Sequence, residues 1–370
     1  MQTPRLANIE ECTGCAACIS TCSHKAISFR KDVFGFAYPE VDQNLCVDCK
    51  MCENVCPVRK PNEFNSPIVA YACHVTNDEE REKSSSGGIA TLLAKHYVEH
   101  GGIVYGCAFI PPMKIKHIRC SNIEDVDKLR GSKYVQSDLV SAIPHIEKDL
   151  RAGLQVLFIG TPCQADGIRS KFKRFKNLTL VDLVCHGVPS IQFLQDTLPR
   201  SINWNEVKTI SFRRNNDFKI TISGKDAVIL RRPLQKDIFF KGFFTGLLFR
   251  QSCYTCKYAN IKRISDITLA DFWGLKSEHM IDNERGISLV LINSEKGGLL
   301  FDKIKSQLIY EQRPLQEAQT GNAQLNHPYK KTIREAIFKW MYPKFGYNVA
   351  IAFAIPDRII GTKILYLFKR

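Results

Sequence analysis

Beyond residue 67 the chain alternates short apolar runs with stretches of helical periodicity. Buried strands are predicted where the apolar runs are short and continuous, over residues 68–75, 103–109, 155–160 and 178–185. Helices are predicted between them, over residues 88–100, 137–152, 164–174 and 190–200. Such alternation is typical of parallel strands joined by crossover helices, so a site is expected at the carboxyl edge of the sheet.

An antiparallel pattern follows this region. It covers residues 207–213, 218–223 and 228–232, and buried strands return at 267–270 and 287–292. These runs indicate a hairpin layer added to an α/β domain.

The composition is that of a folded protein. The chain has 370 residues, of which 44% are hydrophobic and 24% charged, enough for two or three compact units. No apolar run of about 18 residues predicts a spanning helix, and no secretory signal opens the sequence. We therefore expect a cytoplasmic protein, in which 15 cysteines indicate metal or redox chemistry rather than disulfides.

The first eight cysteines form two motifs with the same spacing. The order C-x2-C-x2-C-x3-C runs from Cys12 to Cys22 and again from Cys46 to Cys56, where Pro57 follows. This is the spacing of bacterial ferredoxins, in which three thiolates of one loop bind a 4Fe–4S cluster and the fourth binds the other cluster. The fourth cysteine is expected at the start of the following helix. Two zinc ribbons, the alternative, would use longer gaps between ligand pairs.

The spacing assigns ligands to both clusters. One cluster is expected on Cys12, Cys15, Cys18 and Cys56, and the other on Cys22, Cys46, Cys49 and Cys52.

Seven cysteines remain, and four lie where chemistry would be placed. Cys163 and Cys185 each follow a predicted strand, and Cys253 and Cys256 form a turn that can chelate a metal. Together they could hold a third 4Fe–4S cluster. The alternative is that they are buried thiols and a dithiol pair. The other three show no ligand spacing and are interpreted as core residues: Cys73, Cys107 and Cys120.

Two polar, glycine-containing turns could bind phosphate. Residues 84–88 read Ser-Ser-Ser-Gly-Gly before a predicted helix, and the turn at 130–137 carries Lys133. Exposed amides at a helix start can cradle phosphate, but a serine cap without a ligand gives the same pattern.

Six segments in order resemble the coenzyme F420 hydrogenase/dehydrogenase beta-subunit family. They are SSSGGIATLLAKHYVEHGGIVYGCAF, RGSKYVQSD, FIGTPCQADGIR, VCHGVPS, CYTCKYA and DITLADFWG. The resemblance implies FAD beside a 4Fe–4S cluster, with Cys163, Cys185, Cys253 and Cys256 as the cluster ligands. It also implies flavin contacts at Ser86, Gly87, Gly88, Lys133 and Gln136.

The resemblance also sets the expected fold class and domains. The fold class is α/β (α+β): a small two-cluster ferredoxin domain before a larger α/β flavin-binding domain with added antiparallel strands. The domains are 1–60, a linker at 61–67, a beta-subunit-like domain at 68–330 divided near 150–160, and a basic, apolar tail at 331–370. The tail is expected to pack on its own domain, with membrane-surface contact as the alternative.

The implied function is an oxidoreductase. Single electrons would pass from a carrier such as ferredoxin through three 4Fe–4S clusters to FAD, which can exchange two electrons with coenzyme F420 or another organic acceptor. The alternative is an electron-relay subunit with no substrate of its own. His186 is a candidate for a proton role near the flavin, with a packing histidine as the other interpretation.

The charge bears on the partner. The formal net charge is +15, and three clusters at about −2 each leave about +9. This suits an acidic electron carrier of the ferredoxin or flavodoxin type, or a partner oxidoreductase subunit. Lysines and arginines are scattered rather than gathered in one helix, so nucleic-acid binding is not expected.

Overall fold

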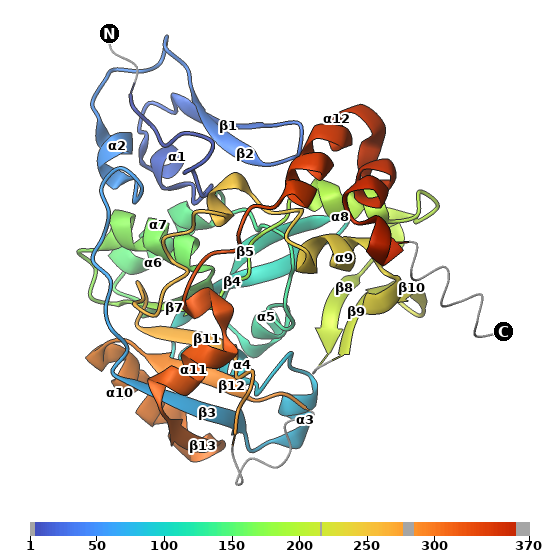
Figure 1. Ribbon diagram of the computed structural model, residues 1–370. Coiled ribbons are helices and arrows are strands. Elements are labelled where there is room, and N and C mark those ends of the chain that lie inside the picture. Colours follow the sequence, from blue (N-terminus) through green and yellow to red (C-terminus); the bar gives the residue numbers. More distant parts are fainter. Residues whose placement is uncertain (1–3, 215–216, 277–284, 360–370) are drawn as a thin grey trace, which may run out of the picture.

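The computed structural model describes residues 4–214, 217–276 and 285–359. Its largest element is an eight-stranded sheet in the order β13-β3-β12-β11-β7-β6-β4-β5 (Figure 1). In that order the strands are Leu308–Arg313, Val69–Val75, Ser288–Ile292, Ile267–Asp271, Leu178–Leu183, Val156–Gly160, Ile103–Ile110 and Lys114–Cys120.

The sheet is mixed. Three of the four strands in the alternating pattern, β4, β6 and β7, are parallel neighbours as predicted, and β11 adds a further parallel strand. The fourth, β3, has only antiparallel neighbours, β12 and β13, and β5 and β12 also run against their neighbours β4 and β11. The outer strands β5 and β13 were not predicted from apolar runs. β5 alternates buried Ile115 with exposed Lys114, and a half-exposed edge strand of this kind carries polar residues that interrupt an apolar run.

Helices cover both faces of the sheet. α4 (Ile89–Glu99) and α10 (Glu295–Ile304) contribute to one core with Leu157 of β6. α6 (Ala142–Arg151) and α7 (Pro162–Phe172) contribute to the opposite core with Val156 and Phe158 of the same strand. Side chains of a strand alternate between faces, so a continuous apolar run serves both cores.

The helix predicted over 137–152 begins later than expected. Asp138 forms a bridge with Lys116, and its backbone exchanges hydrogen bonds with Ile115 and His117 of β5. Because this pairing holds the backbone extended, α6 begins only at Ala142.

A small module lies above the sheet at the N-terminal end of the chain (Figure 1). It contains helices α1 (Ala17–Thr21) and α2 (Met51–Val55) and an antiparallel hairpin, β1 (Ile27–Lys31) with β2 (Ala37–Val41). We call residues 4–60 the ferredoxin-type module. α1 contacts α7, which joins the module to the large sheet.

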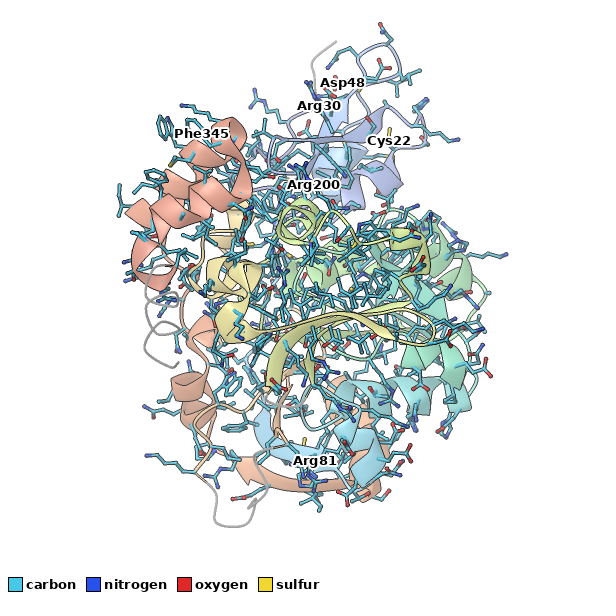
Figure 2. All side chains as sticks on the ribbon, turned by 90° about the vertical axis from the view of Figure 1, so that its right-hand side faces the viewer. Cys22, Arg30, Asp48, Arg81, Arg200 and Phe345 are labelled. Atoms are coloured by element: carbon cyan, nitrogen blue, oxygen red, sulfur yellow. The ribbon has the colours of Figure 1, made fainter. Side chains whose placement is uncertain are left out.

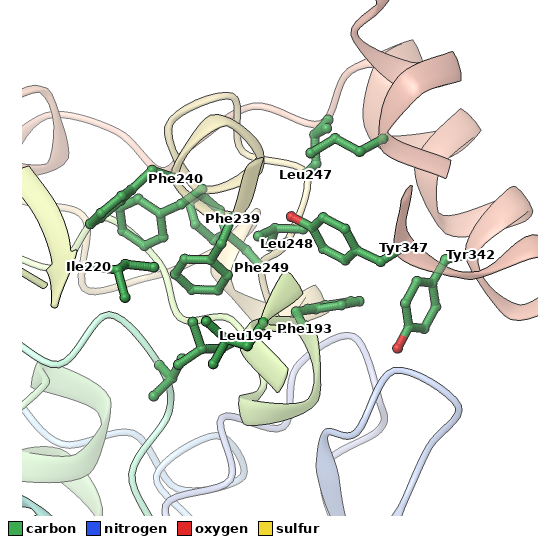
Figure 3. Close-up of a cluster of buried hydrophobic side chains, with 14 of the residues drawn as sticks. Phe193, Leu194, Ile220, Phe239, Phe240, Leu247, Leu248, Phe249, Tyr342 and Tyr347 are labelled. Carbon is green, nitrogen blue, oxygen red and sulfur yellow. The ribbon is translucent and has the colours of Figure 1, made fainter. Parts of the chain in front are cut away.

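A second core lies beside the sheet. It is built on a three-stranded sheet with α8 (Ile191–Thr197), α9 (Ile238–Phe244) and α12 (Ile333–Ala354). Figure 3 shows Tyr342 and Tyr347 of α12 beside Phe193 and Leu248. The three strands are β8 (Thr209–Arg214), β9 (Asp217–Ser223) and β10 (Val228–Pro233), in antiparallel pairs as predicted.

The short helices and the tail complete the fold. The remaining α-helices are α3 (Asp78–Glu82), α5 (Ile123–Asp127) and α11 (Leu315–Gly321). α12 packs the first part of the predicted tail against the second core, while 360–370 lie outside the described residues. No helix in the described ranges has the length and apolar character that crossing a bilayer requires.

Candidate functional site

The two cysteine loops of the ferredoxin-type module have the same backbone. In the first loop Gly14 has φ 71° and Ala16 has φ 63°, and in the second Asp48 has φ 54° and Lys50 has φ 59°. Left-handed residues that alternate with ordinary ones turn successive amides toward one concave point, a geometry found at iron–sulfur sites. The two cysteine motifs, which share one spacing in the sequence, therefore also place left-handed residues at the same positions.

The first group of predicted ligands is brought together. Cys12, Cys15, Cys18 and Cys56 line one small cavity. Burial, together with the neighbouring Cys12 and Cys56, raises the pKa of Cys18 to about 12. Buried thiols so close to one another resist ionisation, so thiolates here need a cationic metal centre.

The fourth cysteine of each motif lies where the sequence did not place it. Cys22 ends α1 and Cys56 ends α2, at the C-cap of each helix rather than at a helix start. The reason is that each helix begins two residues after the second cysteine of its motif and therefore carries the third, Cys18 or Cys52.

The second group lies nearer to solvent. Cys49 is exposed, Cys22 and Cys46 are partly buried and Cys52 is buried. Burial raises the pKa of Cys52, and Cys49 contributes to the rise. Cys52 also acts on Cys18 of the first group, so the two groups are adjacent.

The third group also converges. Burial, with a contribution from Cys256, raises the pKa of Cys163 to about 11 and that of Cys253 to about 12. Burial raises the pKa of Cys185 well above its usual range, with contributions from Cys253, Cys163 and Cys256. The four cysteines, which span 93 positions from Cys163 to Cys256, thus share one partly buried region.

The local fold explains two of these positions. Cys163 is the second residue of α7, whose start is capped by Thr161 and Gln164. Cys185 lies two residues beyond the end of β7. Within the described part of the chain, no three His, Cys, Asp or Glu side chains are placed to hold a single metal ion. A 4Fe–4S cluster is larger than one ion, and each of its four ligands binds a different iron atom.

The ferredoxin-type module is fixed to the sheet by polar contacts. Lys171 of α7 donates to the Ser20 carbonyl at 3.0 Å, and Lys257 donates to the Pro57 carbonyl at 2.8 Å. Asn62 donates to Asp166 of α7 at 2.7 Å. Asn62 belongs to the segment predicted as a linker, which is therefore anchored.

A large cavity lies at the carboxyl ends of β6 and β7. Its volume is about 1070 Å³, and its lining includes Cys163, Cys185 and His186 on one side. Ser86 and Gly88, at the start of α4, line it as well. This is the edge of the sheet at which the alternating pattern predicts a site. The volume is slightly above the usual range for ligand pockets, about 300–1,000 Å³.

The Ser-Gly turn leaves a helix start open to this cavity. Gly88 is the N-cap of α4 with φ 87° and makes no side-chain cap. Gly87 does not line the cavity. It packs under the turn, where a β-carbon would come within 2.3 Å of the Cys73 carbonyl, and its amide donates to Ser288.

A partly buried arginine, Arg130, lines the same cavity as this turn. Arg130 donates to Glu80 and Asp127, both at 2.7 Å. Its third nitrogen, Nη1, is buried and has no hydrogen-bond partner among the described residues. Arg130 lines the cavity together with Ser84, so this unused donor suits an anionic ligand group.

Lys133 and Gln136 line the cavity but are engaged elsewhere. The Lys133 amine donates to the carbonyls of Leu129 and Arg130, at 2.7 and 2.8 Å. Burial lowers the pKa of Lys133 to about 8. Gln136 donates to the Thr13 carbonyl of the ferredoxin-type module at 3.0 Å.

His186 lies in an aromatic pocket at the cavity wall. Its ring centroid is 5.3 Å from that of Tyr329 and 5.4 Å from that of Phe243. Burial lowers its pKa, so the ring is neutral near pH 7. Its Nε2 is buried without a hydrogen-bond partner among the described residues.

The DITLADFWG motif has two separate roles. Asp266 is structural, because its carboxylate accepts from the Leu180 amide and the Ser294 hydroxyl. Asp271 and Trp273 line the cavity. Asp271 forms an ion pair with Arg213, whose guanidinium carbon lies 5.6 Å from the Trp273 ring centroid.

The family follows from the sequence as a whole. Residues 70–144 and 153–318 match the N-terminal and C-terminal family models of the coenzyme F420 hydrogenase/dehydrogenase beta subunit. The chain belongs to this beta-subunit family. Residues 11–60 match a 4Fe–4S dicluster domain, so this member of the beta-subunit family carries an N-terminal iron–sulfur domain.

Solved structures include a similar chain. One chain of the F420-reducing NiFe hydrogenase complex from Methanosarcina barkeri is 19% identical to this one. The alignment covers 75% of this chain and 94% of that chain, with a TM-score of 0.49. No curated protein matches the sequence of this beta-subunit family member significantly.

Several residues at these sites were not predicted. Arg250 and Gly167 lie between the first and third cysteine groups, where they contact Cys12 and Cys15. Arg130 lines the cavity together with the Ser-Gly turn. Arg130 stands in a segment that identifies the beta-subunit family, so its motif could have indicated it. Arg250 precedes Cys253 by three residues, but nothing in the sequence shows that it reaches the ferredoxin-type module.

Proposed function

We propose that this protein is an iron–sulfur flavoprotein oxidoreductase. It would take single electrons from a carrier such as ferredoxin through three 4Fe–4S clusters to FAD, and exchange two electrons with coenzyme F420 or another organic acceptor. The observation that supports this most directly is the cavity bordered by both Cys163 and Cys185 and by the Ser-Gly turn. A cluster held by these cysteines would lie at the wall of the flavin site.

The residues around the cavity fit FAD. The open amides at the start of α4 and the unused Arg130 Nη1 suit the pyrophosphate, and His186 Nε2 offers one more unused polar atom. When bound, a flavin exchanges electrons singly with iron–sulfur clusters and in pairs with an organic substrate. The protein's part is to hold these groups in order and to exclude water between them.

The contacts support an order for the three groups of cysteines. Cys163 and Gly167 are four residues apart on α7, about 6 Å along the helix axis, and Gly167 lies against Cys15. The first group is therefore next to the third. The second group, with exposed Cys49, lies nearer to the surface, and we assign it to electron entry. The proposed domain limits remain 1–60, 61–67, 68–330 and 331–370.

The surface around Cys49 indicates how a carrier would dock. Leu45, Val47 and Met51 are 49–51% exposed beside the second group. Residues 1–60 contain seven Lys or Arg and seven Asp or Glu, so the positive charge that predicts an acidic carrier lies beyond residue 60. We propose that apolar contact dominates recognition at this face, and that the protein acts in the cytoplasm, where thiols stay reduced.

A relay subunit is the second candidate. α12 exposes Trp340, Phe345 and Phe353 by 55–64% on the side away from the second core, and Figure 2 shows Phe345 at the outer side of this helix. Three exposed aromatic side chains on one helix suit a contact with a protein partner. The family is described as a beta subunit, which also favours a partner oxidoreductase subunit.

One experiment tests the proposal. Anaerobic reconstitution should yield about twelve irons and one FAD per chain. Reduced ferredoxin, nicotinamides and coenzyme F420 would then be tested as electron donors. Activity that appears only after a second polypeptide is added supports the relay, while zinc in place of iron and sulfide contradicts both candidates.

A further inference from the structure

Arg250 lies buried between two of the cysteine groups. Its side chain is 1% exposed, three residues before Cys253 of the third group. Its guanidinium reaches into the ferredoxin-type module, where Nη2 lies 3.6 Å from the Cys12 sulfur and Nε donates to the Cys12 carbonyl at 2.6 Å. One side chain thus connects the third group with the first.

The positive charge of Arg250 has no carboxylate partner in the described part of the chain. Its other acceptors are the Ala37 carbonyl at 2.8 Å and the Gln136 side-chain oxygen at 3.2 Å. The Tyr38 ring lies 4.1 Å from the guanidinium carbon. Arg263, which is also buried, differs because it pairs with Asp182. A buried charge without a counter-charge is unfavourable.

Anionic clusters would supply the missing counter-charge. A 4Fe–4S cluster with four thiolates carries a charge of about −2 when oxidised, and one more negative charge when reduced. Arg250 contacts Cys12 directly, and its charge also lowers the pKa of Cys163 and Cys253, whose main shift, caused by burial, is upward. It is therefore placed to act on the first and third groups, most strongly on the first.

We propose that Arg250 is a positioning residue that raises the reduction potential of the cluster held by Cys12, Cys15, Cys18 and Cys56. This rests on the proposed function. The step concerned is a one-electron transfer: the cluster of the second group, already reduced by the carrier, would lose one electron, the cluster held by the first group would gain it, and no bond or proton is exchanged. A cation beside a ligand sulfur stabilises the more negative, reduced state, and so favours transfer inward from the second group.

The test separates the effect of the Arg250 charge from that of its hydrogen bonds. Arg250→Gln removes the charge, and Arg250→Lys keeps it with fewer hydrogen bonds. Arg81→Lys is the matched control, because Arg81 is also 1% exposed but lies at the end of the molecule opposite Cys22 and Asp48 (Figure 2). Each full-length protein is reconstituted, its iron is counted, and its clusters are titrated potentiometrically with detection by electron paramagnetic resonance.

The proposal expects Arg250→Gln to shift at least one cluster transition to a more negative potential at unchanged iron content. Arg250→Lys should shift it less, and Arg81→Lys should shift none. Unchanged potentials in a fully loaded Arg250→Gln protein would overturn the role of Arg250 and leave the proposed function standing. If Arg250→Gln does not take up iron, Arg250→Lys decides, because it keeps the charge but makes fewer hydrogen bonds. A large negative shift of the cluster potential in an iron-loaded Arg250→Lys protein would contradict a charge effect. A wild-type protein without iron would instead refute the proposed function.

Discussion

Gly167 of α7 lies against Cys15 of the ferredoxin-type module. A β-carbon on Gly167 would stand 2.7 Å from the Cys15 β-carbon and 2.8 Å from its sulfur. This contact requires a residue without a side chain, because real β-carbons do not approach other atoms so closely. α7, which carries Cys163 of the third cysteine group at its start, therefore also packs against Cys15 of the first group.

Gly167→Ala should displace Cys15 and destabilise the protein. Alanine in a helix is favoured over glycine by about 1 kcal/mol, but overpacking a close contact costs about 1–3 kcal/mol. We expect a lower midpoint of thermal unfolding and a loss of up to about four irons per chain, the content of one cluster. Calorimetry and iron analysis of the reconstituted protein measure both.

Gly298→Ala is the matched control for this change. Gly298 also lies in a helix, α10, but the nearest atom to its β-carbon position is the Ile292 Cγ2 at 3.7 Å, an ordinary contact. Alanine there should raise stability slightly and leave the iron content unchanged. Equal behaviour of the two variants would show that the Gly167 contact does not matter.

Arg130→Gln should weaken FAD binding. Its Nη1 is the unused buried donor beside the Ser-Gly turn, and a charge-assisted hydrogen bond is worth about 1.5–3 kcal/mol. We therefore expect roughly 10- to 100-fold weaker binding, measured by fluorescence titration of flavin-free protein. Arg119→Gln is the control, because Arg119 pairs with Asp149 at 2.8 Å and does not line the cavity. An unchanged affinity in Arg130→Gln would remove the phosphate role.

Local pattern predicted the inner strands and the places of Cys163 and Cys185, because both depend on neighbours in sequence, but it misplaced Cys22 and Cys56 relative to their helices. The apolar runs predicted β6 and β7, and the expected places of Cys163 and Cys185 followed from the ends of these strands. Edge strands β5 and β13 were missed, because their exposed faces carry polar residues. The cluster ligands and flavin contacts themselves stay predictions.

Long-range contacts could not be predicted from the sequence. Arg250 and Cys12 are 238 residues apart. A periodic pattern relates only residues that are close in sequence, so it cannot predict this contact. Lys133 and Gln136 lie at the expected cavity, but their hydrogen bonds to Leu129 and Thr13 depend on how loops fold over one another. A motif indicates that a residue is near a site, whereas its bonding depends on tertiary packing.

Met51→Gln should slow electron entry from a protein carrier. Met51 is 50% exposed beside Cys52, and the loss of an apolar contact at the centre of an interface typically costs about 1 kcal/mol or more. We expect the second-order rate to fall by roughly fivefold, with only weak dependence on salt. Stopped-flow reduction by ferredoxin measures this rate, and reduction by dithionite should not change. Leu299→Gln on α10, 61% exposed, should leave both rates unchanged.

His117 should make the folded protein sensitive to acid. The ring is buried and stacked on Phe158, its Nε2 donates to the Ile159 carbonyl at 3.0 Å, and its Nδ1 accepts from Ser137. Burial lowers the pKa of His117 to about 4, whereas an unfolded histidine titrates near 6.5. Between these values the unfolded chain binds a proton that the folded chain does not. Stability contributed by the neutral ring is therefore complete above about pH 6.5 and is lost as the pH falls toward 4, by about 3 kcal/mol in total.

Comparison of His117→Gln with the wild-type protein isolates this effect from that of other acid-sensitive groups. The free energy of unfolding, measured with denaturant between about pH 4.5 and 7.5, should fall more steeply with acid in the wild-type protein. The exposed His145 is the control, and His145→Gln should keep the wild-type slope. Parallel pH profiles for the wild-type protein and His117→Gln would show that His117 is protonated in the folded state as readily as in the unfolded one, and that its burial at the cavity wall does not hold it neutral.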